Sequence, residues 1–160
     1  MYRPFYLYAR LRDTGYTPEE FAQQEGLHIV GTRDFKRPLH GAYLPTHGVI
    51  LVNNTLLSRE RQWTLWHELF HHYAYTEAWR FLDTDDEDTY ANLFAATWFT
   101  LRGREVPEGV ELRRLIGFLE RLIHLHGGLL NEFDFPRQEK FDMVLFDRQR
   151  QDSTGKIAPN

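Results

Sequence analysis

The sequence of 160 residues contains no cysteine. A chain without cysteine forms no disulfide and offers no thiolate to a metal ion, so the ligands of any metal site must be histidine, aspartate or glutamate. The sequence also lacks an apolar run of membrane-spanning length, and its start, Tyr2-Arg3-Pro4, is not typical of a signal peptide. We therefore expect a cytoplasmic protein that does not enter the membrane.

The sequence also has no excess of basic over acidic residues. The formal net charge is −4, which gives no electrostatic reason to expect direct binding to nucleic acid. Hydrophobic residues make up 42% of the chain and aromatic residues 15%, which is enough apolar material to form a folded core. The length fits one domain. We predict a single domain over residues 1–152 and a flexible tail over residues 153–160.

The pattern of apolar residues, caps and turns predicts an α+β fold. Its elements are expected to be a small antiparallel sheet or hairpin packed on three or four helices. The expected ranges are a helix at 17–26, a strand at 27–30, a hairpin at 41–44 and 49–53, and helices at 58–75, 84–102 and 110–126.

The central helix of this arrangement carries the motif H-E-x-x-H over residues 67–71. On a helix, His67 and His71 lie one turn apart on one face, where a single metal ion can contact both. Glu68 lies about 100° further around the helix, so it can reach a metal-bound water rather than the metal. A buried helix with these polar groups needs compensation for the cost of burial, and a metal ion supplies it. His72 points away from His71 and is expected to make a separate polar contact.

Two histidines leave a metal site incomplete, because a catalytic zinc ion usually has three protein ligands and one open position for water. The acidic segment at the start of the next helix is the natural source of the third ligand. Asp88 and Asn92 are four residues apart and share a helical face. We predict Asp88 as the third ligand and Asn92 as a hydrogen-bonding group behind the site, with Glu87 as the alternative ligand.

Several blocks of this sequence occur in the order and near the spacing of a known family. They resemble the ImmA/IrrE family of zinc metallopeptidases, which shows an I-x-[IVL]-N strand, an R-x-T-x-A-H-E-x-G-H helix and an E-x-x-A-[ND]-x-F-A helix. The matching segments are GAY (41–43), GVILVN (48–53), RQWTLWHELFHH (61–72) and DTYANLFAA (88–96). Trp66 and Phe70 replace small residues of the family pattern, and Asp88 stands where the family has glutamate.

The resemblance implies a compact minimal zincin core, similar to that of the gluzincins, and an enzyme that hydrolyses peptide bonds. Zinc would be held by His67, His71 and Asp88, with Glu68 as general base. Zinc is preferred to Mn²⁺ or Fe²⁺ by this resemblance, because two histidines and one carboxylate also suit iron. The implied substrate is a DNA-binding repressor of helix-turn-helix type, whose cleavage derepresses stress, prophage or mobile-element genes.

Two further parts of the chain are candidates for roles in hydrolysis. Tyr90 is a candidate for stabilising the oxyanion, with core packing as the alternative. The strand formed by Val49, Ile50, Leu51, Val52 and Asn53 is a candidate for pairing with the substrate backbone as an added strand.

Two other functions remain open at this point. One is a metal-binding but proteolytically inactive protein that binds a partner, as a toxin–antitoxin or phage regulatory component. The bulky residues Trp66 and Phe70, together with Asp88, favour it. The other is a metal-free helical toxin or anti-defence protein in which the histidines are incidental.

Overall fold

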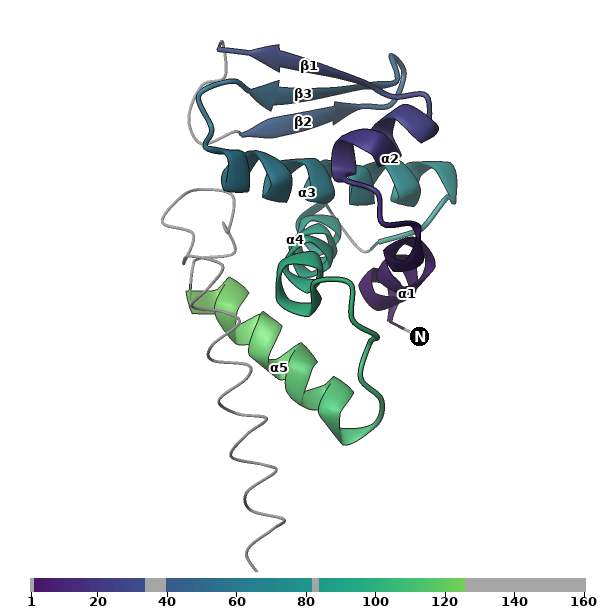
Figure 1. The fold of residues 1–160 in the computed structure, drawn as a ribbon, viewed down its shortest axis with the longest axis vertical. Helices are drawn as coiled ribbons and strands as arrows, with labels where there is room; N and C mark the ends of the chain where they lie inside the picture. Colours follow the sequence, from purple (N-terminus) through teal and green to yellow (C-terminus); the bar gives the residue numbers. More distant parts are fainter. Residues whose placement is uncertain (1, 34–39, 82–83, 126–160) are drawn as a thin grey trace, which may run out of the picture.

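The computed structural model of the protein describes residues 2–33, 40–81 and 84–125. Within these ranges the chain has the α+β fold predicted from the sequence (Figure 1). The elements are α1 (Arg3–Leu11), the 3-10 turn η1 (Arg12–Thr14), α2 (Pro18–Gln24), β1 (His28–Thr32), β2 (Gly41–Leu44), β3 (Val49–Asn53), α3 (Ser58–Thr76), α4 (Thr84–Leu101) and α5 (Val110–Leu125). No helix in the described ranges is both long and apolar enough to span a membrane. The predicted tail at 153–160 lies outside the described residues.

Helix α3, which carries H-E-x-x-H, is at the centre of the fold as predicted. The sheet covers one side of α3, and α4 and α1 lie on the other side, with α5 packed beyond α4 (Figure 1). Eleven of the 19 residues of α3 are buried. Because these residues point in all directions around the helix axis, α3 has no solvent-facing side over most of its length.

The sheet contains three strands in the order β1-β3-β2. β2 and β3 form the predicted antiparallel hairpin, with Gly41 opposite Val52. β1 pairs with β3 in parallel, so the sheet is mixed and the prediction of a purely antiparallel sheet is wrong in this respect. The apolar pattern that predicted a strand at 27–30 contains no information about the direction of β1, which is set by its pairing with β3.

The strand order contradicts the prediction that Val49, Ile50, Leu51, Val52 and Asn53 bind the substrate backbone. These residues form β3, the middle strand, which is paired with β1 on one side and with β2 on the other. Its backbone donors and acceptors are therefore already used in the two ladders. Within the described residues, β2 is paired on one side only, so β2 (Gly41–Leu44) has a free edge that lies over α3.

Helix α1 is not among the elements predicted from the sequence. Its buried residues include Phe5, Tyr8 and Leu11, which recur every three positions and form one apolar face. This face packs against α4, and the Tyr8 hydroxyl donates a hydrogen bond of 2.6 Å to the backbone oxygen of Arg104. α1 therefore completes the core on the side of α4 that α3 leaves uncovered.

Gly41 allows β2 to approach α3 closely. A Cβ atom at this position would lie 2.5 Å from Cγ2 of Thr64 and 3.0 Å from the backbone oxygen of Leu51. We predict that Gly41→Ala lowers the free energy of unfolding by about 1–3 kcal/mol, because buried neighbours must move. Urea denaturation would measure the loss.

Gly31→Ala is the matched control, because Gly31 lies opposite the same residue, Val52, on the other side of β3. The three atoms nearest to a Cβ added there all belong to the side chain of Asn54, which is exposed and can rotate away. The expected change is within about 0.5 kcal/mol. Equal losses in the two variants would contradict the role assigned to Gly41.

Candidate metal centre

Helices α3 and α4 bring three potential metal donors together. These are the Nε2 atoms of His67 and His71 on α3 and the carboxylate of Asp88 in the second turn of α4. His67 is buried, whereas the side chain of Asp88 is 52% exposed. One histidine of the group is therefore buried in the core, whereas the carboxylate side of the group is open to solvent.

The distances within this group suit a single tetrahedral ion. The two Nε2 atoms are 3.1 Å apart, and Oδ1 of Asp88 lies 3.0 Å from Nε2 of His71 and 3.5 Å from Nε2 of His67. Ligand atoms at zinc–ligand distances of 2.0–2.1 Å and tetrahedral angles are about 3.3 Å apart. The donors therefore lie within a few tenths of an ångström of the separation that such an ion requires.

The other ring nitrogens of the two histidines are held by α4. Nδ1 of His67 lies 2.9 Å from Oδ1 of Asn92, and Nδ1 of His71 lies 2.8 Å from Oε1 of Glu87. When each Nδ1 donates its proton to its partner oxygen, each Nε2 keeps a lone pair directed at the shared point. Metal-ligating histidines have this arrangement in general.

The sequence left Asp88 and Glu87 open as third ligand, and the structure gives them different positions. Asp88 contacts the Nε2 atoms of both histidines, whereas Glu87 contacts Nδ1 of His71, on the far side of that ring. Asn92, expected from the sequence as a hydrogen-bonding group behind the site, contacts Nδ1 of His67. The geometry thus favours Asp88 as the ligand and Glu87 as an orienting residue.

Glu68 is buried at 6% exposure, beside β2. Its Cγ would lie 3.3 Å from a Cβ atom placed on Gly41, so the carboxylate arm runs between α3 and the edge strand. Its charge is among the causes that raise the pKa of His71, so the two groups are electrostatically coupled. Glu68 is therefore next to the histidine pair without being one of its three donors.

The pKa values of His71 and Asp88 are shifted in opposite directions. Burial lowers the pKa of His71, but hydrogen bonds with Asp88 and Glu87 and the charge of Glu68 outweigh this and raise the pKa to about 9. Hydrogen bonds with His67 and His71 hold the pKa of Asp88 well below its usual range. Without a metal, the group is thus a histidinium–carboxylate pair.

Tyr90 is placed with partly buried aromatic residues that pack against the core. Its ring lies 5.0 Å from the ring of Tyr2 and 5.4 Å from that of Phe81, measured between centroids. Asp88 precedes it by two residues, so the two side chains leave α4 about 200° apart. This position favours core packing, the alternative weighed for Tyr90, over a role at the oxyanion.

His72, which is buried, belongs to a second network that reaches the surface at Glu25. Its Nδ1 lies 3.0 Å from the hydroxyl of Tyr43 on β2, and its Nε2 lies 3.1 Å from Oε2 of Glu25. The Tyr73 hydroxyl donates to the other oxygen of Glu25 at 3.2 Å. Sequence reasoning predicted a polar contact for His72 but named neither partner, because Glu25 is 47 residues away and no local pattern links them.

Trp66 and Phe70, the two bulky residues that differ from the ImmA/IrrE pattern, pack in the hydrophobic core. Trp66 is stacked on Trp98, with centroids 4.1 Å apart, and Phe70 packs against Phe94 and Trp79. Both side chains are buried. Their volume is thus accommodated between the helices.

Comparison with protein-family models, with curated proteins and with solved structures finds no match to this chain. The resemblance to the metallopeptidase family consequently rests on the sequence motifs alone.

The paired charges of His71 and Asp88 make the stability of the metal-free protein depend on pH. The pKa of His71 is raised on folding. Its charged form therefore contributes fully to the free energy of unfolding below a pH of about 6.5, the pKa of an unfolded histidine, and this contribution is lost as the pH rises through about 9. The pKa of Asp88 is lowered on folding. Its carboxylate therefore contributes to the free energy of unfolding above a pH of about 4, and this contribution is lost as the pH falls further. We predict a loss on the order of 1–3 kcal/mol between pH 6 and 9.5, measured by urea unfolding in a chelator.

Asp88→Asn should lose less free energy of unfolding over the same pH interval. The amide is uncharged, so it does not stabilise the protonated form of His71. Asp86→Asn, which removes a neighbouring carboxylate from the same helix, is the matched control and should behave like the wild type. An identical pH dependence in wild type and Asp88→Asn would contradict the ion pair.

Proposed function

We propose that this protein is a zinc-dependent endopeptidase. The observation that carries the proposal is the convergence of two imidazole nitrogens and one carboxylate oxygen at tetrahedral-ligand distances, with the buried carboxylate of Glu68 beside them. Three protein donors with an open side are typical of catalytic rather than structural zinc.

The donor set fits a zinc ion. His67, His71 and Asp88 would hold it, while Asn92 and Glu87 fix the orientation of the two rings. When bound, zinc acts as a Lewis acid and lowers the pKa of a coordinated water towards neutrality. Mn²⁺ and Fe²⁺ are the alternatives that the same donors suit.

The residues of the chain supply the acid–base chemistry and the alignment of the substrate. Glu68 accepts the proton of the attacking water and delivers it to the leaving amine as the peptide bond breaks. The free edge of β2, which passes over Glu68 at Gly41, replaces β3 as the strand that pairs with an extended substrate. An edge strand offers unused backbone donors and acceptors for this purpose.

The proposed substrate is a DNA-binding repressor of helix-turn-helix type. This part of the proposal is supported by the resemblance to the ImmA/IrrE family. Cleavage of such a repressor would derepress stress, prophage or mobile-element genes.

A metal-binding but inactive partner-binding protein is the second candidate. Trp66 and Phe70 no longer favour it, because both side chains are accommodated in the core. Asp88 still favours the inactive protein, since aspartate is one methylene shorter than the glutamate of the family pattern. The contact of Asp88 with both histidines supports the enzyme instead, because the carboxylate reaches the Nε2 atoms despite its shorter side chain.

Metal analysis of variants tests the site. We predict near-stoichiometric zinc in the wild type and loss of zinc in Asp88→Ala, because a ligand is removed. Glu87→Ala and Asn92→Ala should still bind zinc, about 10–100-fold more weakly, since each removes an orienting group only. Elemental analysis and chelator competition would measure both effects. Loss of zinc in Glu87→Ala with retention in Asp88→Ala would reverse the two roles.

Substitution of Glu68 tests the proposed peptidase activity and the role of Glu68 as general base. We predict that Glu68→Gln binds zinc as tightly as the wild type and cleaves peptides about 10²–10⁴-fold more slowly, because the general base is removed. Mass spectrometry of a pooled peptide library, and of repressors encoded near the gene, would measure cleavage.

Glu60→Gln is the matched control, because Glu60 lies in the first turn of the same helix and accepts a hydrogen bond from the backbone N–H of Leu57. It should keep full activity. Zinc binding without cleavage in the wild type would favour the inactive partner-binding protein, and undiminished cleavage by Glu68→Gln would exclude the proposed mechanism.

A further inference from the structure

Tyr75, in the last turn of α3, is a large aromatic residue that the fold leaves 60% exposed. It follows His71 by four residues and Glu68 by seven, so its side chain leaves the helix in a direction between theirs. Side chains on a helix lean towards its N-terminus, so the ring of Tyr75 covers the preceding turn, which carries His71. The ring therefore lies on the strip of α3 that also presents His71 and Glu68, about one turn further along.

Tyr43 of β2 forms a second aromatic wall beside Tyr75. The two ring centroids are 6.3 Å apart and the planes meet at 68°. The hydroxyl of Tyr43 lies 3.0 Å from Nδ1 of His72, whose Nε2 lies 3.1 Å from Oε2 of Glu25. Tyr43 is thus held in place by buried and half-buried partners before any ligand binds. Because Tyr43 belongs to the edge strand, the two rings form a corner at the free edge of β2.

The corner formed by Tyr43 and Tyr75 is close enough to the candidate metal centre to contact a side chain next to the cleaved bond. Tyr75 lies six residues beyond the midpoint of His67 and His71, which is about 9 Å along the helix axis. An extended peptide rises about 3.3 Å per residue, so this length corresponds to fewer than three residues. The lean of the ring towards His71 shortens it further. A peptide paired with β2 would therefore place its first or second side chain from the scissile bond at the corner.

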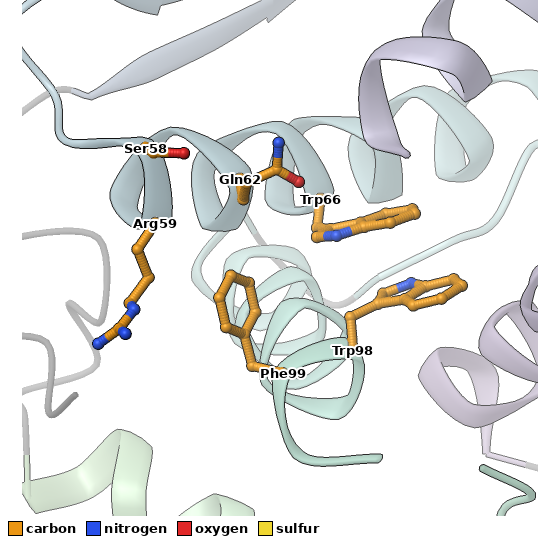
Figure 2. Close-up of a pocket in the computed structure, with 6 residues that line it drawn as sticks. All are labelled: Ser58, Arg59, Gln62, Trp66, Trp98 and Phe99. Carbon is orange, nitrogen blue, oxygen red and sulfur yellow. The ribbon is translucent and has the colours of Figure 1, made fainter. Parts of the chain in front are cut away.

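The cavity between the first turns of α3 and the last turns of α4 is a separate feature. It measures about 480 Å³ and is lined by Ser58, Arg59, Gln62, Trp66, Trp98 and Phe99 (Figure 2). Tyr75 follows Trp66 by nine residues, so the two side chains leave α3 in opposite directions. The cavity is therefore on the other side of α3 from the corner and does not receive a peptide that is held by β2.

We propose that Tyr43 and Tyr75 form a subsite for a large apolar side chain of the substrate, aromatic above all, one or two residues from the scissile bond. Aromatic rings pack favourably edge to face, and covering the exposed ring of Tyr75 removes apolar surface from water. Tyr75 is thus a specificity-determining residue. This inference rests on the proposed peptidase function, and it adds the kind of sequence that the enzyme selects.

A cleavage profile of the zinc-loaded, full-length protein on a peptide library provides the first measurement. Mass spectrometry should show phenylalanine, tyrosine, tryptophan and leucine enriched at one position within two residues of the cleaved bond. Two peptides that differ only at that position, with phenylalanine or alanine, then give a ratio of kcat/KM values. We expect a ratio of about ten or more for the wild type.

Tyr75→Ala should lower this ratio to about two or less, while kcat/KM for the alanine peptide stays within about twofold of the wild type, because only the contact with the apolar side chain is lost. Tyr75→Phe keeps the ring and should keep the ratio. Tyr16→Ala is the matched control. Tyr16 is also an exposed tyrosine, at 39%, but it packs edge to face on Phe21, which contacts Trp66 on the opposite side of α3.

The outcomes separate this inference from the proposed function. Cleavage by the wild type without an apolar preference, an unchanged ratio in Tyr75→Ala, or an equal fall in Tyr16→Ala would overturn the subsite and leave the peptidase function standing. Absence of any cleavage by the zinc-loaded wild type would overturn both.

Discussion

The contact between α3 and α4 is the constraint on which the rest of the structure depends. At one end of this contact Trp66 stacks on Trp98, and further along the same two helices His67 meets Asn92 and His71 meets Asp88. Packed side chains at protein-interior density leave little freedom to slide. The aromatic stack therefore sets the separation at which the polar groups meet, and a change of packing at one end is transmitted to the other.

The buried histidines of α3, His67 and His72, are tolerated in the core because neighbouring elements satisfy their ring nitrogens. α4 supplies Asn92 to His67, while His72 is held by Tyr43 of β2 and by Glu25 at the end of α2. An unpartnered polar group at this depth would cost several kcal/mol. The same partners that remove this cost also fix each ring in one orientation, which is the requirement for binding a metal ion.

The sequence predicts the parts of this molecule that depend on local spacing. The helices predicted at 58–75 and 84–102, the hairpin and the placement of His67 and His71 on one helical face all follow from residue spacing, caps and turn residues. The direction of β1 and the choice between Asp88 and Glu87 do not, because they depend on how whole elements pack. Adjacent residues on α4 differ by about 100° in direction, so the rotational setting of the whole helix decides which of the two faces the Nε2 atoms of the histidines. Glu25 could not be found at all, since its partner is distant in the chain.

The proposed donors are close together in the chain, and this has a consequence for the order of folding. The contact between His67 and Asn92 spans 25 residues within two consecutive helices, whereas that between Glu25 and His72 spans 47 and requires α2 to dock beside α3. Short loops close at a lower entropic cost and contribute to faster folding. The helical hairpin that carries the proposed donors can thus form before α2 docks beside α3, so the metal-binding group would assemble ahead of the network around His72.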